Sequence, residues 1–230
     1  MIDLPLKPAR ADGLFVFTRF PQPGCTKTRL IPALGEQGAA DMQRQMTEHL
    51  MSRFQGRCQN SSFEQAALSV QVHFAGGTAE QMSSWLGESF TFVLQREGDL
   101  GERLTGALQQ GFTSGLNRIA VIGSDCPELE LQQVTQALQL LNRYDAVLGP
   151  ALDGGYYLIA LKQPLPFLFE NIPWSTKRVF EKTKAIAASH NLSIALLKPL
   201  SDIDEPEDLP LWYALQPTQF GLSSSAQSRL

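Results

Sequence analysis

The sequence predicts an α/β fold, a three-layer α/β/α arrangement around a mixed, mostly parallel central sheet. Short apolar segments alternate along the chain with longer amphipathic ones, which indicates strands connected by helices. Two apolar segments lie close together around Asp153-Gly154-Gly155, and this break in the alternation indicates an antiparallel pair. With 230 residues and neither a linker nor a repeat, we expect one domain, with a core over 14–215 and a flexible tail over 216–230.

Each expected element has a local signal. Apolar residues rich in β-branched types predict strands over 14–18, 68–75, 90–94, 119–125, 145–150, 156–161 and 192–197. Apolar residues at helical spacing predict helices over 35–54, 78–87, 99–112, 131–141, 177–189 and 206–215. Two of these helices begin with capping-box spacing, Thr78 with Gln81 and Asp99 with Glu102.

The composition excludes several classes of protein. The chain is 43% hydrophobic and 18% charged, which is typical of a globular protein. Its net charge of -4 provides no electrostatic surface for nucleic acid, so phosphate binding would need a few local cations or a metal. Cys25, Cys58 and Cys126 are an odd number without metal-ligand spacing, which favours a reducing compartment. No segment is long and apolar enough for a membrane span or a signal core, so we expect a cytoplasmic protein without a membrane partner.

Asp125 ends the buried strand that begins at Ile119 (IAVIGSD). Such a run is typical of a central strand covered on both faces, and open α/β sheets bind ligands outside the carboxyl ends of their strands. An aspartate there can hold a divalent cation against a phosphate. It can equally cap the helix that follows, and the strand alone leaves both interpretations open.

The loop over 20–30 (FPQPGCTKTRL) follows the first strand. Two prolines and Gly24 stiffen it, and it brings Lys27 and Arg29 close to the strand end, near Arg19. Arginine can present two donors to phosphate oxygens and lysine a point charge, so we interpret the loop as a phosphate-binding segment. The alternative is a solvated basic loop. Neither a P-loop nor a Gly-x-Gly-x-x-Gly helix start is present.

The segment over 149–157 (GPALDGGYY) places adjacent glycines after an acid. Gly154 and Gly155 allow positive φ and a close approach of a ligand, although the same residues are ordinary hairpin chemistry. Tyr156 and Tyr157 point to opposite faces of an extended chain, so one could line a pocket while the other packs. Trp174 could lie in a binding loop or simply pack.

The segment over 200–209 (LSDIDEPEDL) carries two aspartates on one face if it is extended. Asp204 with Glu207 has capping-box spacing around Pro206, which is a strong alternative to a ligand role for Asp204. Asp202 is harder to explain as a cap. Two such carboxylates repel each other unless a cation lies between them or water solvates them.

Other chemistry is not supported. The three histidines, His49, His73 and His190, are scattered and suggest no metal triad. No Gly-x-Ser-x-Gly elbow indicates a hydrolase. Cys126 is interpreted as a small buried hydrophobe rather than a nucleophile.

Six motifs occur in an order that resembles one bacterial family. They are KTRL, DLGERL, GSDCP, GPxxDGGYY, WST and DIDxPEDL. Together they resemble DUF2064, a family of GT-A-fold, nucleotide-diphospho-sugar transferase-like proteins, often described as transferases associated with radical-SAM or selenium-related genes. That family is similar to 2-phospho-lactate guanylyltransferases and, more distantly, to molybdenum-cofactor and sugar nucleotidyltransferases. The resemblance extends from about 15 to 215, and Arg19 departs from it because a lysine is more usual there.

The resemblance implies roles for individual residues. Asp125 corresponds to the metal-binding Asp-x-Asp position, and Asp202 or Asp204 to a second acidic ligand for Mg²⁺ or Mn²⁺. Lys27 and Arg29 correspond to residues that meet the nucleotide phosphates. Gly154 and Gly155 correspond to backbone that lines the acceptor side, where Tyr156 and Trp174 are further candidates.

These assignments lead to three hypotheses. The first is glycosyl transfer from a nucleotide-diphospho-sugar to a small acceptor, with Asp125 as a catalytic metal ligand and Asp153 as the acceptor-side base. The second is nucleotidyl transfer, in which a phosphorylated small molecule attacks a nucleoside triphosphate and pyrophosphate leaves. The basic loop suits this chemistry, since a triphosphate needs more cation. The third is nucleotide binding without catalysis. The sequence leaves the base, the sugar, the acceptor and the oligomeric state open.

Overall fold

The computed structural model describes residues 11–55 and 68–215. The expected tail over 216–230 and Cys58 lie outside the described residues. The strands are β1 (Asp12–Arg19), β2 (Leu68–Ala75), β3 (Thr91–Leu94), β4 (Ile119–Gly123), β5 (Ala146–Pro150), β6 (Tyr156–Leu161) and β7 (Ile194–Leu196). The helices are α1 (Ile31–Ser52), α2 (Ala79–Leu86), α3 (Leu100–Thr113), α4 (Leu131–Leu140), α5 (Val179–Ser189) and α6 (Leu209–Leu215). Every strand and helix predicted from the sequence is present, with ends that differ by a few residues.

The strands form one sheet in the order β3-β2-β1-β4-β6-β5-β7. All neighbouring pairs are parallel except those that β6 makes with β4 and β5. The exception comes from the close β5–β6 connection at Asp153-Gly154-Gly155, where the short turn returns the chain antiparallel. This confirms the predicted mixed, mostly parallel sheet. Strand β4 therefore has a parallel neighbour, β1, on one side and an antiparallel neighbour, β6, on the other.

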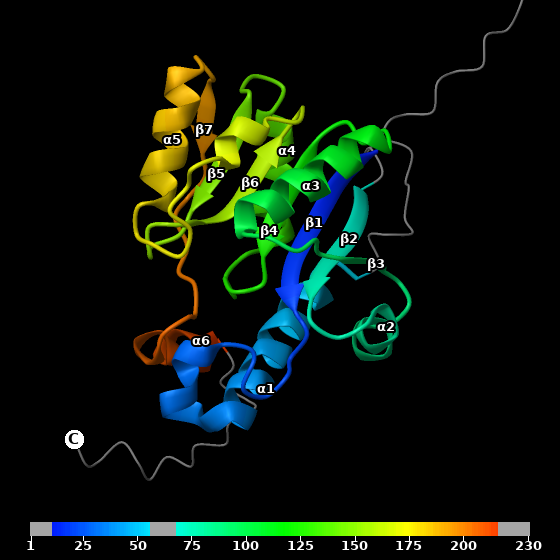
Figure 1. The fold of residues 1–230 in the computed structure, drawn as a ribbon, viewed down its shortest axis with the longest axis vertical. Coiled ribbons are helices and arrows are strands. Elements are labelled where there is room, and N and C mark those ends of the chain that lie inside the picture. The colour runs from blue at the N-terminus through cyan, green and yellow to red at the C-terminus, as the bar shows by residue number, and fades with distance from the viewer. Residues whose placement is uncertain (1–10, 56–67, 216–230) are drawn as a thin grey trace, which may run out of the picture.

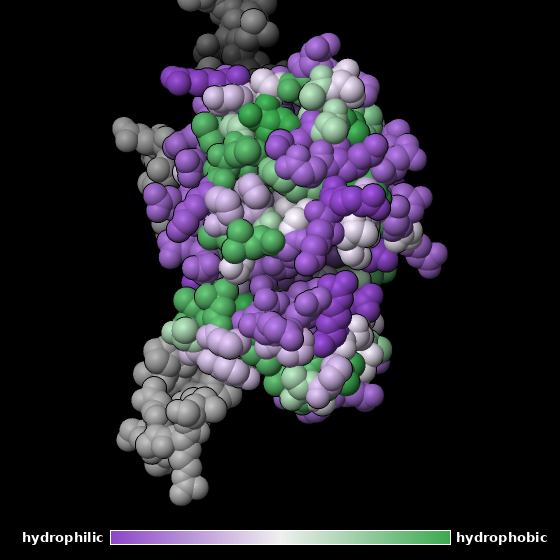
Figure 2. Space-filling model, turned by 90° about the vertical axis from the view of Figure 1, so that its left-hand side faces the viewer, coloured by the Kyte–Doolittle hydropathy of each residue, from purple (hydrophilic) through white to green (hydrophobic). Residues whose placement is uncertain are grey.

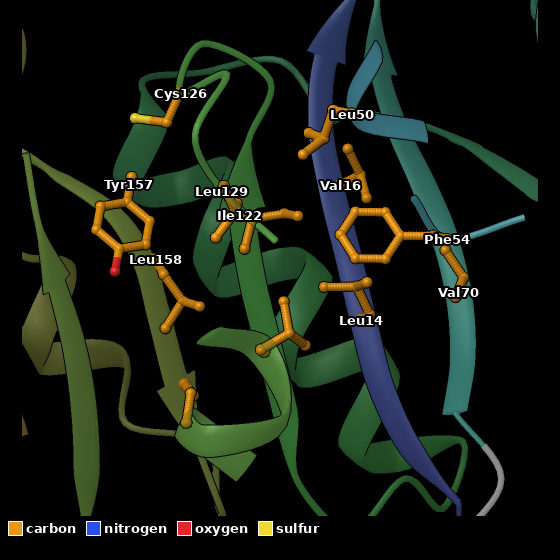
Figure 3. Close-up of a cluster of buried hydrophobic side chains, with 14 of the residues drawn as sticks. Leu14, Val16, Leu50, Phe54, Val70, Ile122, Cys126, Leu129, Tyr157 and Leu158 are labelled. Carbon is orange, nitrogen blue, oxygen red and sulfur yellow. The ribbon is translucent and has the colours of Figure 1, made fainter. Parts of the chain in front are cut away.

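Helices cover both faces of the sheet, as the three-layer prediction requires (Figure 1). On one face α1, α2 and α4 pack against alternate strand residues such as Leu14 and Val16 (Figure 3). On the other face α3 and α5 pack against the intervening residues, among them Phe15. Both faces of β1 and β4 are consequently buried, which explains their continuous apolar sequences.

A third, smaller core joins α1 to α6. It contains Leu30, Ala39, Met42, Met46, Ile203, Leu209 and Trp212. Figure 1 shows α6 and the first part of α1 together beyond the carboxyl ends of β1 and β2. Helix α1 bends at Gly35, whose φ of 71° is not helical, so the chain can turn from the loop after β1 into the long part of the helix. No helix in the described ranges is long and apolar enough to cross a membrane.

Substitution of Gly111 tests the contact between α3 and the sheet. A Cβ at Gly111 would lie 2.6 Å from Phe15 and from Ile119. We therefore expect Gly111→Ala to lower the free energy of unfolding by about 1–3 kcal/mol, although alanine favours a helix. Gly106→Ala on the same helix is the matched control, because its Cβ would meet only the flexible side chain of Arg96. Equal urea midpoints for the two variants would contradict this packing.

Candidate functional site

A cavity of about 780 Å³ opens at the carboxyl ends of β4 and β5, where three predicted segments meet. The sequence-predicted residues that line it are Arg29, Asp125, Asp153, Gly155, Tyr156, Tyr157, Trp174, Asp202 and Asp204. Figure 2 shows hydrophilic side chains on both sides of a hollow between the main body and the smaller part that α6 belongs to. The strand order places β2 on one side of β1 and β4 on the other, and open α/β sheets bind ligands outside the carboxyl ends of their strands at such a switch in order.

Asp125 does not cap the helix that follows it. Helix α4 begins at Leu131, its N-cap is Glu130, and Gln133 accepts the backbone N–H of Glu130. The Asp125 side chain is instead about half exposed toward the cavity, and its Oδ1 lies 2.9 Å from Lys27 Nζ. Its Oδ2 has no hydrogen bond or ion pair to any residue that the structure describes. The capping interpretation is therefore wrong, and one oxygen of Asp125 is available to a ligand.

Lys27 is a buried cation that holds the cavity floor together. Its ammonium contacts Asp125, lies 3.6 Å from Asp204 Oδ1 and donates to the backbone oxygen of Ile203 at 2.5 Å. Burial lowers the pKa of Lys27, but the attraction of Asp125 and then Asp204 outweighs it, and the net pKa is raised. Lys27 does not line the cavity, so it acts on a ligand only through these carboxylates.

The other residues of the basic loop are arranged differently. Arg29 is exposed at the cavity and its Nη1 bonds Asp204 Oδ2 at 2.6 Å. Arg19 donates to the backbone oxygen of Cys25, which closes the loop on itself. Gly24 has a φ of 74°, a conformation that allows this turn. Neither Arg19 nor Gly24 lines the cavity, so of the loop residues that we assigned to phosphate only Arg29 reaches it.

The two late aspartates have different environments. Asp204 is paired with Arg29 and Lys27, and the predicted capping box of Asp204 with Glu207 is wrong, because Glu205 is the N-cap of the following turn and Asp208 is its partner. Asp202 has no cation partner among the described residues. Burial, followed by the negative charge of Asp153, raises the pKa of Asp202 to about 6. Asp202 thus carries a charge that no direct ion pair neutralises within the described chain, although Lys27 attracts it from a greater distance.

The Asp153-Gly154-Gly155 turn forms one wall of the cavity. Asp153 Oδ1 accepts the backbone N–H of Gly155 at 2.7 Å. Gly154 lies outside the lining, and a Cβ there would collide with the backbone of Lys177. Its φ of 93° and the bond from Phe180 N to its oxygen fix the turn against the segment before α5. Gly154 is therefore required for packing, while Gly155 faces the cavity.

Aromatic residues also line the cavity. Tyr156 and Tyr157 lie on opposite faces of β6, as predicted, and both contribute to the lining. Burial raises the pKa of Tyr157 to about 12, and its hydroxyl donates to the backbone oxygen of Lys198. Trp174 packs edge-on against Tyr156, with ring centroids 6.4 Å apart. Cys126 is 3% exposed, and burial raises the pKa of its thiol, as expected for a buried hydrophobe.

Several further lining residues had no individual role in the sequence analysis, although some belong to segments that it singled out. They are Leu100, Leu152, Ser175, Thr176, Lys177, Val179, Ser201, Glu205 and Asp208. Leu100 and Leu152 are exposed apolar side chains at this cavity, and no local pattern separates them from ordinary surface leucines. With these residues included, the lining holds six carboxylates and two basic side chains, Arg29 and Lys177. The cavity is consequently acidic.

The donor set fits a divalent cation that a phosphate helps to hold. The described residues contain no group of three side chains arranged to hold a metal by themselves. Mg²⁺, however, is usually bound by one or two carboxylates together with waters and substrate phosphates. Asp125 has a free oxygen, and Asp202 is unpaired with a raised pKa, so this cavity favours an added positive charge. Asp125 and Asp202 are the residues that would hold such an ion.

The α/β fold matches that of nucleotide-diphospho-sugar transferase-like structures. A crystal structure from Desulfovibrio desulfuricans G20, described as a "putative nucleotide-diphospho-sugar transferase", is 31% identical, with a TM-score of 0.78 over 94% of this chain and 92% of that one. The model of the family "Uncharacterized protein conserved in bacteria (DUF2064)" matches residues 57–176, slightly more than half of the chain. The chain belongs to this DUF2064 family.

More distant structures share the fold. A CMP:2-keto-3-deoxy-manno-octonic acid synthetase complexed with CTP has a TM-score of 0.54 at 10% identity, over 91% of this chain and all of that one. Rv0371c of Mycobacterium tuberculosis H37Rv, in complex with manganese, has a TM-score of 0.51 at 12% identity, over 88% of this chain and 97% of that one. No curated protein matches the sequence. At 10–12% identity these two structures show a shared fold.

Replacement of Lys27 tests its role in the cavity floor. Lys27→Met leaves the charges of Asp125 and Asp204 without their buried partner. We expect the free energy of unfolding to fall by about 1–3 kcal/mol, with water limiting the loss because both carboxylates are partly exposed. Lys177→Met removes a lining lysine that has no ion pair among the described residues, and should change stability by less than about 0.5 kcal/mol. Urea unfolding of both variants makes the comparison.

Asp202 predicts an unusual pH dependence. The pKa of Asp202 is about 4 in the unfolded chain and is raised to about 6 in the folded protein. The ionised carboxylate therefore lowers the free energy of unfolding: this cost is absent below about pH 4 and grows as pH rises through 6. We expect Asp202→Asn to match the wild type in urea at pH 4 and to exceed it at pH 7. Asp204→Asn loses two ion pairs and should be less stable than the wild type at pH 7. A less stable Asp202→Asn at pH 7 would contradict this assignment.

Proposed function

We propose that this protein is a Mg²⁺- or Mn²⁺-dependent glycosyltransferase that uses a nucleotide-diphospho-sugar donor and a small-molecule acceptor. The observation that carries the proposal is the free oxygen of Asp125 at the end of β4, in one cavity with the unpaired Asp202. The relative that is 31% identical over nearly the whole chain supports the choice of donor. The metal would be held by Asp125 and Asp202, and when bound it supplies positive charge against the donor diphosphate.

Arg29 and Asp153 have complementary roles in this proposal. Arg29 uses Nη1 for Asp204, and its remaining guanidinium N–H groups have no partner within the described chain, so they can donate to phosphate oxygens. Asp153 is exposed at the cavity wall and can accept the proton of an acceptor hydroxyl. The acceptor oxygen bonds to the anomeric carbon while the bond from that carbon to the diphosphate breaks. The nucleoside diphosphate leaves with the electron pair.

Nucleotidyl transfer is the second candidate. It is favoured by the CTP complex of a protein with the same fold, and Arg29 of the basic loop after β1 reaches the cavity where a triphosphate would lie. In this reaction a phosphate oxygen of the acceptor bonds to the α-phosphorus of a nucleoside triphosphate, and pyrophosphate leaves. The two candidates share the cavity and the metal and differ in the leaving group.

Ligand-induced stabilisation tests the proposal. A ligand present at 100 times its Kd raises the free energy of unfolding by about 2.7 kcal/mol, so a panel of UDP-, GDP-, ADP- and dTDP-sugars and nucleoside triphosphates, with and without Mn²⁺, should raise the Tm for at least one donor. We expect Asp125→Ala to weaken the Mn²⁺-dependent affinity roughly tenfold or more, about 1.4 kcal/mol. Glu128→Ala, which removes a nearby carboxylate outside the cavity lining, should not.

The products separate the candidates. Release of a nucleoside diphosphate from the stabilising donor supports glycosyl transfer, and release of pyrophosphate from a triphosphate supports nucleotidyl transfer. Stabilisation without either product identifies a nucleotide-binding protein that lacks catalysis. Unchanged Mn²⁺-dependent affinity in Asp125→Ala contradicts the metal site, and the absence of any Tm shift contradicts nucleotide binding altogether.

A further inference from the structure

A buried cluster of polar side chains lies behind Asp125. It consists of Thr18 on β1, Gln43 and Thr47 on α1, and Ser124 at the end of β4, and each of them is at most 6% exposed. Their neighbours in this layer are apolar side chains such as Val16 and Ile122. Polar groups are costly at such depth unless they are hydrogen-bonded, so their bonds are informative.

The hydrogen bonds of the hydroxyl groups run in one direction through this cluster. Ser124 Oγ accepts from Thr18 Oγ1 and from Gln43 Nε2, both at 3.1 Å. Ser124 Oγ in turn donates its own proton to Asp125 Oδ1, at 3.4 Å. Thr18 has given its proton to Ser124, so Thr47, 3.0 Å away, must donate to Thr18. The hydroxyls therefore form a chain of donors that ends on the Asp125 carboxylate.

Gln43 holds this chain in place. Its Nε2 lies 3.1 to 3.2 Å from the hydroxyl oxygens of Thr18, Thr47 and Ser124. On the other side of Asp125, Lys27 contacts the same oxygen, Oδ1. Oδ1 is thus bound from two directions within the protein, and Oδ2 is the oxygen left toward the cavity. Consecutive hydrogen bonds polarise one another, which strengthens the last one.

We propose that Gln43 and Ser124 are positioning residues that orient the Asp125 carboxylate so that Oδ2 faces the metal and phosphate of the donor. The functional part of this proposal rests on the proposed function. An apolar cluster of the same shape would serve packing alone at similar stability, so stability does not account for four polar side chains at this position. Gln43 lies outside the cavity lining, so it acts on Asp125 only through its hydrogen bond to Ser124.

The test uses Gln43→Met, which keeps the side-chain size and removes the donor. Its matched control is Gln45→Met on the same helix, because Gln45 makes no hydrogen bond to the cluster and its Oε1 has no partner. The probe is Mn²⁺ with inorganic pyrophosphate, which stands in for the diphosphate of any nucleotide-diphospho-sugar. We expect calorimetry to show about tenfold weaker Mn²⁺-dependent binding for Gln43→Met, equivalent to about 1.4 kcal/mol, and less than about twofold for Gln45→Met.

Two double-mutant cycles with Asp125→Ala complete the test. In the first, Gln43→Met should no longer weaken probe binding once Asp125 is absent. The second cycle measures the free energy of unfolding of the metal-free protein in urea. The losses caused by Ser124→Ala and Asp125→Ala should be less than additive in the double variant, and the same should hold for Gln43→Met combined with Asp125→Ala. Additive losses, or equal probe binding by Gln43→Met and Gln45→Met, overturn the positioning role. If the wild type does not bind the probe, the proposed function fails, while the metal-free cycle still decides whether the cluster orients Asp125.

Discussion

The ammonium of Lys27 joins three segments that are distant in sequence: the loop after β1, the end of β4 and the segment before α6. Lys27 has a φ of 47°, a left-handed conformation that costs a non-glycine residue about 1–3 kcal/mol. Its contacts with Asp125, Asp204 and the backbone oxygen of Ile203 compensate for that cost. The hydrogen bond from Ile203 N to Asp125 O adds a backbone link between the end of β4 and the segment before α6. The cavity floor depends on this connection.

This use of the loop cations explains the charge of the cavity. Lys27 and Arg29 are both paired with other carboxylates of the protein, while Asp202, whose pKa is raised by burial and then by the negative charge of Asp153, forms no ion pair among the described residues. Like charges at close range destabilise one another. A folded protein tolerates such a pair where a ligand brings the missing positive charge, and perturbed carboxyl groups in a cavity are a recognised mark of a functional site. The proposed metal requirement follows from this imbalance.

The sequence predicts more of the fold than of the site. Apolar periodicity and capping-box spacing located every β-strand and α-helix of the described chain but not the short 3-10 helices over 28–30 and 166–169, and the strand-end position of Asp125 followed from the buried run before it. The site depends on contacts such as that between Lys27 and Ile203, 176 positions apart, which local patterns do not encode. The interpretation of Asp204 as a helix cap was wrong because its carboxylate forms an ion pair with Arg29, which is distant in sequence. One signal was readable: Gln43 and Thr47 interrupt the apolar face of α1 at i and i+4.

The difference between Lys27 and Arg29 bears on the choice of donor. Lys27 is buried and its partners are fixed, whereas Arg29 is exposed and can exchange Asp204 for phosphate oxygens. Among the described residues, Arg29 and Lys177 are therefore the basic side chains of the lining that can meet phosphates, against six lining carboxylates. A triphosphate brings more negative charge into this cavity than a diphosphate esterified to a sugar, and each added charge must be offset by a cation. The arrangement of charge thus supports the diphosphate donor, and with it glycosyl transfer.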